Sequence, residues 1–303
     1  MSGFTSIDLS KLPKPDVIKQ VDYEALFSEM KTEAIAHLPE LAPFLELESE
    51  PVTKLLRVCA YHRMLDRVEF NDGARANMLA FSTGADLDGL AAFWGVERLI
   101  VQAADDSVSP PIAEIKEDNA AFRARVQLSL EGHTTAGPRG SYLFWTLSAS
   151  GEVKDAAVDS LSPGEVTVTV LAHGEGDGAP SSELLTAVET ALNDEDVRPL
   201  CDTVIVQAVT VLPFEVEAEL TLYDGPGEAQ VLEAAETALA EYLAQHHRIG
   251  HDITLSGLYA ALHQPGVQKV TLTKPAADII VGPAEVGFCP NGDLTVTVGG
   301  RDV

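Results

Sequence analysis

The sequence predicts an α+β protein, with an N-terminal helical region followed by two or more small mixed α/β-sandwich modules. Through much of residues 16–150, apolar residues recur at three- and four-residue spacing, which is typical of amphipathic helices. After Gly151, segments with apolar residues at alternate positions are interleaved with helical segments. We expect four parts: a helical region over residues 1–100, a linker and elbow over 101–150, and two α+β modules over 151–212 and 213–303.

The first helix is expected to begin at Asp16, because a carboxylate there can accept hydrogen bonds from the exposed amides of a first turn. The preceding residues, with Pro13 and Pro15, are expected to form an irregular arm. The apolar stripe of this helix consists of Tyr23, Leu26, Phe27, Met30, Ala34 and Leu38. Pro39 and Pro43 interrupt the pattern, so the helix should end before them.

A second, longer helix is expected from Val52 to Leu79, with Pro51 near its start. One face carries Leu55, Val58, Cys59, His62 and Leu65. Leu56, Tyr61 and Val68 occupy other sides, so one neighbouring helix could hardly cover the apolar surface. The helix is therefore either the centre of a helical domain within the chain or the contact surface for helices of other subunits. Both interpretations stay open on the pattern alone.

A short helix is expected in TGADLDGLAAFWGV, ending at Gly95. Asp86 and Asp88 invite a catalytic interpretation, but carboxylates two residues apart on a helix point to different sides and suit a paired acid and base poorly. We interpret Asp86 as a helix cap. Residues Val101 to Pro111 are expected to form an extended linker.

The chain changes character between Glu117 and Ser150. Phe122, Val126 and Leu130 form an apolar stripe on a helix that should end near Gly132. The turn HTTAGPRG follows, and Tyr142, Leu143, Trp145 and Leu147 resume a helical pattern. The structural positions of this helix-loop-helix elbow are Gly132, Gly137, Pro138 and Gly140. Because no residue of the elbow has an obvious chemical role, we expect it to join two parts of the chain rigidly.

The first module is expected to contain a hairpin, a helix and a returning strand, which together make a small open-faced sandwich. Its segments are Val153 to Val158, EVTVTVLA, a helix with Leu184, Leu185, Val188 and Leu192, and TVIVQAVTV. The second module has a similar layout without a clear sequence repeat. Its expected segments are Phe214 to Leu222, Glu228 to His246, Leu255 to His263, Val267 to Leu272 and Leu294 to Val298.

Composition limits the partners. With 20 basic and 47 acidic residues, the formal charge is −27, which repels nucleic-acid phosphates and anionic membrane surfaces. We therefore expect no nucleic-acid partner and no membrane partner. The three cysteines, Cys59, Cys201 and Cys289, have no paired spacing and are expected to be reduced and mostly buried. No signal peptide is expected at the N-terminus, so synthesis and folding in the cytoplasm are expected.

Cofactor and metal sites find little support in the sequence. Gly174, Gly176 and Gly178 superficially resemble a dinucleotide-binding turn, but Glu175 and Asp177 would repel a pyrophosphate. His246, His247 and His251 are the nearest approach to a metal cluster, although Gly250 breaks their helical spacing; at a helix end, His246 and His247 suit the negative end of the dipole. We expect no catalytic residues, no cofactor and no metal.

Three blocks in order resemble one known family. FSTGADLDGLAAFWGVERL, the elbow sequence EDNAAFRARVQLSLEGHTTAGPRGSYLFWTLSAS and VKDAAVDSLSPGEVTVTVL closely resemble the baseplate J family, a wedge component of contractile phage tails and R-type tailocins. The resemblance runs from about residue 15 to the terminal GGRD. It implies a structural subunit of a baseplate, located in a phage virion or a tailocin particle and assembled in the host cytoplasm.

The resemblance also implies partners. The N-terminal helices of such proteins are expected to join those of a second copy and of a tail protein I subunit in a shared bundle, with Leu55, Val58, Cys59, His62 and Leu65 as the contact residues in this chain. Further expected neighbours are a lysozyme-like wedge component and adjacent wedges, which form a six-fold ring around a central hub. This ring of wedges is expected to change diameter when the sheath contracts.

Two alternative functions remain at this point. A baseplate-associated cell-wall hydrolase would need a convergent pair of carboxylates or a metal site in a cleft, and the abundant acidic residues could supply one. An adaptor that binds a single basic partner would also fit the negative charge.

Overall fold

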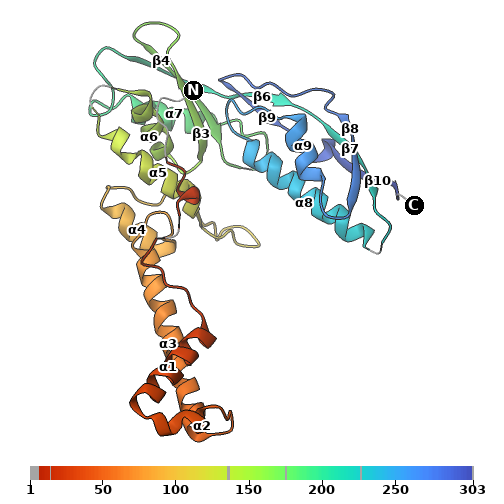
Figure 1. Ribbon diagram of the computed structural model, residues 1–303. Helices are drawn as coiled ribbons and strands as arrows, with labels where there is room; N and C mark the ends of the chain where they lie inside the picture. The colour runs from red at the N-terminus through yellow and green to blue at the C-terminus, as the bar shows by residue number, and fades with distance from the viewer. Residues whose placement is uncertain (1–6, 14, 135–136, 175, 226, 302–303) are drawn as a thin grey trace. The chain divides into compact units, whose positions relative to one another are not determined.

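The computed structural model describes residues 7–13, 15–134, 137–174, 176–225 and 227–301 (Figure 1). The chain divides into two compact units, which are treated separately below. The N-terminal unit comprises residues 6–97 and 119–126, and the C-terminal unit comprises residues 98–118 and 127–303. Helix α5 (Asn119–Gly132) contributes its first half to the N-terminal unit and its second half to the C-terminal unit. The α+β class predicted from the sequence is confirmed.

The N-terminal unit is helical. It contains the short 3-10 helices η1 (Leu9–Lys11) and η2 (Pro39–Leu41) and the helices α1 (Tyr23–His37), α2 (Ala42–Leu45), α3 (Pro51–Ala76) and α4 (Gly84–Ala92). The long helix predicted over residues 52–79 is therefore confirmed as α3, with Pro51 at its first position. Helices α1 and α2 both pack against α3.

Two predicted helix caps are wrong. Helix α1 begins at Tyr23, where Asp22 accepts a hydrogen bond from the amide of Ala25 at 3.0 Å. Asp16 lies instead in a turn that is closed by the bond from Ile18 N to Pro15 O. Helix α4 has Thr83 at its N-cap, and its Gly84 amide donates to the Asn119 side chain at 3.3 Å, so Asp86 is not the cap. Both errors arose because several residues close together can serve as caps.

The predicted extended linker after Val101 folds back on itself. Strands β1 (Ile100–Gln102) and β2 (Ile115–Lys116) pair in antiparallel fashion, and an isolated bridge joins Asp105 to Ile112. Their hydrogen bonds satisfy backbone groups that an extended linker would leave to water. The linker prediction is therefore wrong for this segment.

In the C-terminal unit, the first module is an open-faced sandwich of one sheet and two helices. Strands β3 (Val153–Asp159) and β4 (Glu165–Ala172) form the predicted antiparallel hairpin, and β5 (Thr203–Ala208) pairs with β4 in parallel. Helices α6 (Arg139–Ala149) and α7 (Ser182–Leu192) share one apolar core with this sheet. Val168, Val188 and Leu192 at its centre are fully buried. Figure 1 shows both helices on one side of the sheet.

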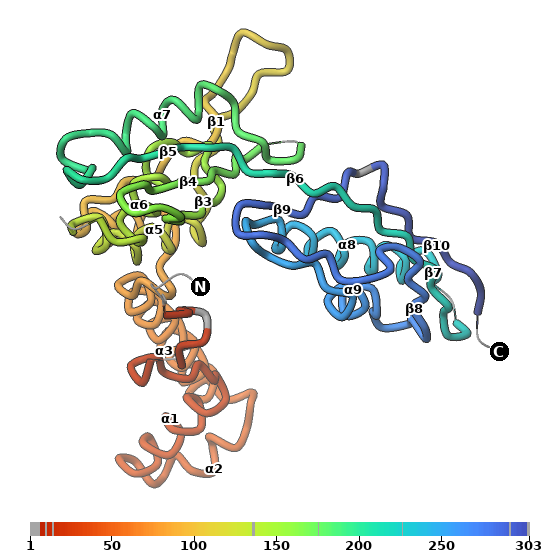
Figure 2. The backbone as a smooth tube through the Cα atoms, turned by 90° about the horizontal axis from the view of Figure 1, so that it is seen from above, coloured from red at the N-terminus to blue at the C-terminus, as the bar shows by residue number. Residues whose placement is uncertain are grey.

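The second module has the same two layers in a different chain order, with both helices between the central strand and its antiparallel neighbour. Its sheet has the order β10-β7-β8, with β7 (Val216–Leu222) in the centre, β10 (Leu294–Arg301) parallel to it and β8 (Val267–Lys274) antiparallel. Helices α8 (Glu228–His246) and α9 (Leu255–Leu262) bury Leu239, Leu258 and Leu262 against β7. The backbone trace in Figure 2 shows the strands and helices of this module as two layers.

The segment TVIVQAVTV is divided between two sheets, although one strand was predicted. Strand β5 ends at Ala208, and β6 (Thr210–Pro213) pairs in parallel with β9 (Glu285–Phe288), a strand that was not predicted. Val209 between them is buried with Leu171 and Val286 in a small core of its own. This core explains why β4 is buried on both faces, a feature that alternation alone does not predict.

Candidate functional site

The long helix α3 has a buried side that the rest of the N-terminal unit covers. Thr53, Ala60 and Asn71 lie on it, and Ala60 has no exposed surface. The Asn71 amide donates to Lys19 O at 2.8 Å and its Oδ1 accepts from Lys19 N at 3.0 Å, which fastens the segment before α1 to the far end of α3. Thr53 donates to Phe44 O at 3.3 Å and fixes α2 in the same way.

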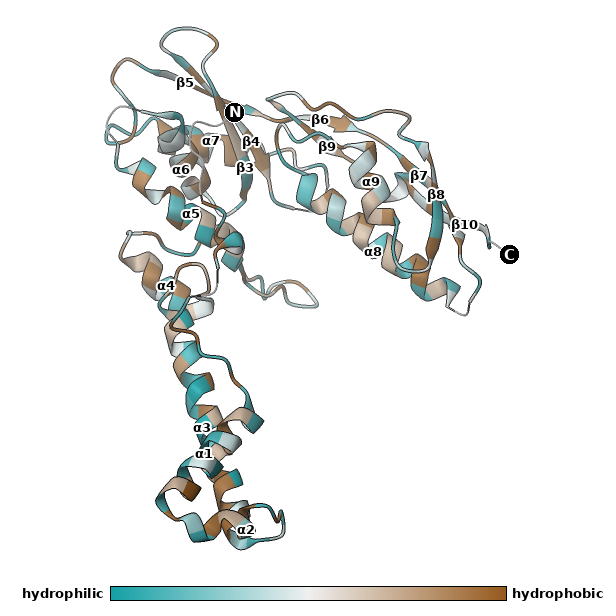
Figure 3. Ribbon diagram, in the orientation of Figure 1, coloured by the Kyte–Doolittle hydropathy of each residue, from teal (hydrophilic) through white to brown (hydrophobic). Residues whose placement is uncertain are grey.

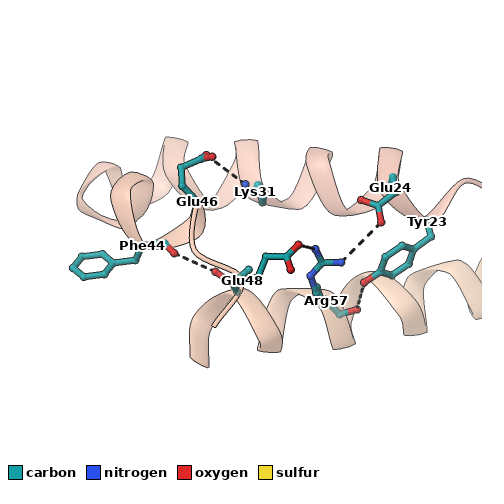
Figure 4. Close-up of polar contacts among 8 residues, drawn as sticks. Tyr23, Glu24, Lys31, Phe44, Glu46, Glu48 and Arg57 are labelled. Atoms are coloured by element: carbon teal, nitrogen blue, oxygen red, sulfur yellow. Dashed lines mark hydrogen bonds and ion pairs between the residues drawn. The ribbon is translucent and has the colours of Figure 1, made fainter. Parts of the chain in front are cut away.

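A polar cluster around Arg57 joins α1 and the turn after α2 to α3 (Figure 4). The guanidinium donates to Glu48 at 2.9 Å, approaches Glu24 at 3.9 Å and lies 4.6 Å from the centre of the Phe27 ring. Tyr23 donates its hydroxyl to Arg57 O at 3.4 Å. Arg57 therefore serves the fold of the unit and is not free for a partner.

The opposite side of α3 is apolar and exposed. The side chains of Leu55, Val58 and Leu65 are 62%, 53% and 41% exposed, and Cys59 and His62 are exposed as well. With 3.6 residues per turn, these five positions fall on the side of the helix away from Thr53, Ala60 and Asn71. The structure thus places the five predicted contact residues on one uncovered face, which we call the α3 face.

The apolar surface extends beyond the predicted residues. Tyr61, Val68 and Phe70 are 49%, 37% and 51% exposed. Leu65 and Val68 also line a shallow groove that continues along the carboxyl half of α3 past Gly73 and Ala76 to Asp86 of α4. Hydropathy colouring shows apolar patches recurring along α3 between polar turns (Figure 3). The sequence had signalled Tyr61 and Val68 as apolar, but it did not place them beside the predicted face.

Such a surface can bind another apolar helix. Burial of one exposed leucine side chain contributes about 1.5–3 kcal/mol, so a partner helix along this face would gain several kcal/mol. Exposed apolar patches of this kind on folded proteins mark protein–protein interaction sites.

In the elbow between α5 and α6, three glycines occupy positions where a Cβ atom would collide with neighbouring residues. A Cβ at Gly132 would collide with the Phe144 ring, and one at Gly140 would lie 2.7 Å from the Glu131 carboxylate. Gly137 has φ +61° and a Cβ there would collide with the ring of Pro199. Pro138 occupies the N-cap position of α6 in an extended conformation. Gly132 and Gly140 therefore allow α5 and α6 to pack at close range, and Gly137 allows the turn to approach Pro199. Thr135 and Ala136 of the turn lie outside the described residues.

Two arginines of α5 have structural roles that the sequence did not reveal. Arg123 donates to Leu79 O at 2.6 Å and to Ser82 O at 2.8 Å, and the buried Arg125 donates to Glu97 O at 2.5 Å. They tie the turn after α3 and the segment after α4 to α5. Leu130 of the predicted apolar stripe is instead 58% exposed.

The residues with possible catalytic or metal-binding chemistry do not converge. Asp86 lies in the first turn of α4. The His247 ring contacts Lys154 and Asp177 O, and the His246 ring lies on Tyr242 at 4.1 Å between ring centres. Within the described ranges, no group of three or more His, Cys, Asp or Glu side chains could hold a metal ion. Glu175 of the acidic loop lies outside the described residues.

The expectation of mostly buried thiols is wrong. Cys59 and Cys201 are exposed, and Cys289 is partly buried. Cys59 is exposed because it lies on the α3 face, and Cys201 because it follows the fully exposed Leu200 in the segment between α7 and β5. None of the helices in the described part of the chain is both long and apolar enough to cross a membrane.

Comparison with known proteins assigns the chain to a family. The Baseplate J-like N-terminal, central and C-terminal domains match residues 48–105, 134–208 and 214–297. Baseplate protein J of Escherichia phage P2 is 42% identical over 301 residues, which cover 98% of this chain and 99% of that protein. A chain in the six-fold symmetrised baseplate of the anti-feeding prophage matches 64% of this chain with 49% of its own length, at 13% identity and a TM-score of 0.45. The chain therefore belongs to the baseplate J-like family.

Proposed function

We propose that this protein is a structural subunit of the baseplate wedge of a contractile phage tail or tailocin. The observation that carries the proposal is the α3 face, where Leu55, Val58 and Leu65 are exposed on a well-packed helix. In this role the N-terminal unit joins a shared helical bundle with a second copy of the chain and a tail protein I subunit. The two α+β modules join neighbouring wedges in a six-fold ring around the central hub, next to a lysozyme-like wedge component.

The packing of α3 supports this assignment. Its buried side already holds α1 and α2, so the α3 face is not needed to fold the unit. A face that the chain's own fold does not use, and that nonetheless carries several large apolar side chains, is typical of a helix that completes its packing in an assembly.

The domain organisation fits a part that transmits movement. We assign residues 1–100 to the wedge bundle, 101–150 to the linker and elbow, and 151–212 and 213–303 to two ring-forming modules. Helix α5 runs without a break from one unit into the other, and its carboxyl end packs against α6 through the glycines of the elbow. In the proposed role, this connection passes a displacement of the bundle to the ring when the sheath contracts.

The charge fits protein partners. A formal charge of −27 disfavours contact with DNA inside the tail and favours partners with basic surfaces. Location in the tail baseplate of a virion, or in a tailocin particle assembled in the host cytoplasm, follows from the same role.

Coexpression tests the proposal. The chain is produced together with the tail protein I encoded beside it, and the purified complex is weighed by native mass spectrometry. We expect two copies of this chain with one copy of the partner. Recovery of a lone monomer in the presence of folded tail protein I would contradict the shared bundle.

A further inference from the structure

Two charged residues of β3 meet the segment that follows α8, where the first module contacts the second (Figure 1). The Lys154 ammonium lies 2.7 Å from His247 Nδ1, and His247 Nε2 lies 3.2 Å from Asp177 O. Asp155 Oδ2 accepts the backbone N–H of Ile249 at 3.0 Å, while its Oδ1 accepts that of Ala156 at 2.9 Å. One imidazole and one carboxylate therefore bridge the two modules beside the small core of Leu171, Val209 and Val286, against which Ile249 packs.

The contact with Lys154 defines the protonation state that His247 needs while Lys154 is charged; burial, and then the charge of Arg248, lower the pKa of Lys154. A lysine ammonium can only donate, so His247 Nδ1 must accept from Lys154 and carries no proton. The single proton of the ring is then on Nε2, which donates it to the carbonyl of Asp177. The contact with Lys154 requires the neutral imidazole, whereas the Nε2–H donated to Asp177 O is present in the neutral and the protonated ring alike and favours the protonated one. A proton on Nδ1 would place two donors and two positive charges against one another at this contact.

The His247 ring is half-buried beside Gly178 and Phe288. A Cβ on Gly178 would lie 2.9 Å from His247 Cε1, and the Phe288 ring of β9 has its centre 5.7 Å from that of the imidazole. Positive charge also gathers here. Arg248 and His251 face Asp155 from the segment after α8, and His173, which follows β4, faces Lys154 from the first module. Beyond Asp155, the opposing charges are Asp177 at His247 and Glu117 and Asp118 at His173.

We propose that this contact is a pH-sensitive latch between the two modules, closed while His247 is neutral and released when His247 takes up a proton. The inference does not depend on the proposed role in a baseplate. It rests on the two bridging contacts and on the position of Lys154.

The direction of the pH dependence follows from the groups involved. Burial, and then the charge of Lys154, lowers the pKa of His247 below its ordinary value, and the same two causes lower the pKa of His173. Above a pH of about 6.5 the ring is neutral in both the closed and the released form, so the latch is closed at full strength. As the pH falls below that value, only the released form takes up the proton, and the ratio of closed to released molecules falls by up to about tenfold per pH unit.

Asp155 acts in the opposite direction. Burial raises the pKa of its carboxyl group, against hydrogen bonds from Ile249 and Ala156 that lower it. The closed form therefore takes up a proton at Asp155 more readily than the released form, which favours closure at the acidic end. Release is accordingly expected in mildly acidic solution, just below the ordinary pKa of histidine.

Hydrogen–deuterium exchange of the full-length chain tests the latch. The Ile249 amide donates directly to Asp155, so the peptide that contains residues 247–250 reports on closure. After correction for the intrinsic exchange rate, we expect this peptide to exchange about tenfold faster at pH 5.5 than at pH 7.5. Peptides from the core of the second module around Leu258 should keep their protection, because the modules stay folded.

Two variants make the test specific. His247→Gln keeps an acceptor for Lys154 and a donor for Asp177 but does not titrate, so its peptide should exchange at the same corrected rate at both pH values. Lys154→Met removes the charge that opposes protonation of His247, so the acid-induced increase in exchange should be smaller than in the wild type. This second variant keeps the test valid if His247→Gln does not form the closed contact. Equal protection of the wild-type peptide at both pH values would overturn the latch. So would full acid acceleration in either variant, or loss of protection throughout the chain.

Discussion

Arg123 shows how one side chain can organise several segments of the N-terminal unit. It lies on α5, far along the chain from α3, and binds the carbonyl groups of Leu79 and Ser82 in the turn that separates α3 from α4. A charged donor that reaches two backbone acceptors replaces the water that the turn would otherwise need. This guanidinium therefore helps to fix the position of α5 relative to the turn, together with the bond from Gly84 N to Asn119.

Replacement of Arg123 should destabilise the N-terminal unit. In Arg123→Met both carbonyl groups lose their charged donor, and we expect the free energy of unfolding to fall by about 2–4 kcal/mol. Urea unfolding followed by circular dichroism measures this change. Arg63→Met is the matched control, because Arg63 is an exposed residue of α3, and its effect should stay below about 0.5 kcal/mol. Similar losses in both variants would show that the two hydrogen bonds do not stabilise the unit.

Glycine also acts at the scale of single residues in the elbow. Gly132 and Gly140 have no unusual backbone conformation, and what excludes a side chain is the nearby Phe144 ring and the Glu131 carboxylate. Gly137 combines a positive φ with a close neighbour, Pro199. The sequence indicated a turn here because glycine and proline cluster, but the packing reason depends on contacts that only the fold supplies.

Among the elements, α3 has one packed side and one exposed apolar side. One side packs against α1, α2 and the segment around Lys19. On the other side, leucine and valine side chains are exposed to solvent. An exposed leucine contributes little to the stability of its own chain but much to a contact with a partner. Substitutions on the α3 face should therefore separate folding from assembly.

Leu55→Asp tests this separation. Because Leu55 is 62% exposed, we expect the free energy of unfolding to change by less than about 0.5 kcal/mol. Affinity for tail protein I, measured by isothermal titration calorimetry, should fall by at least about tenfold, since a charge replaces buried apolar surface. Leu161→Asp is the control, at an 85% exposed leucine outside the N-terminal unit, and it should bind as the wild type does. Equal binding by all three proteins would argue against the α3 face as the contact.

Elements with a strong period could be predicted from the sequence. The helix over residues 228–246 and the strand EVTVTVLA have the predicted boundaries, because a long helical stripe and a strict alternation leave few other solutions. Short segments could not be predicted in this way. The β1–β2 ribbon and β9 depend on backbone pairing with distant segments, and the break at Val209 depends on a core shared with Leu171 and Val286.

The residues of the α3 face could be predicted from the sequence, but the exposure of that side of the helix could not. Four apolar or small residues and His62 were visible as a stripe on one helix face, and the structure places them together on the exposed side. Which side of α3 stays exposed could not be decided from the stripe, because Leu56, Tyr61 and Val68 made the helix apolar on several sides. The packing of α1 against Ala60 decides it.

In the whole molecule, an acidic surface surrounds apolar patches of different kinds. The excess of 47 acidic over 20 basic residues keeps separate copies apart at long range. Association therefore requires short-range apolar contact or a partner of opposite charge.

The native cysteines allow the central claim to be tested without any substitution. Cys59 lies on the α3 face and Cys201 lies in the C-terminal unit, and both are exposed in the isolated chain. Alkylation with iodoacetamide, followed by mass spectrometry of the peptides, measures both thiols in one sample. In the complex with tail protein I, we predict that Cys59 reacts at least about tenfold more slowly than in the isolated chain, because a buried thiol is reached only through opening of the contact, while Cys201 reacts at its original rate. Unchanged alkylation of Cys59 in a complex of confirmed composition would contradict burial of the α3 face on assembly.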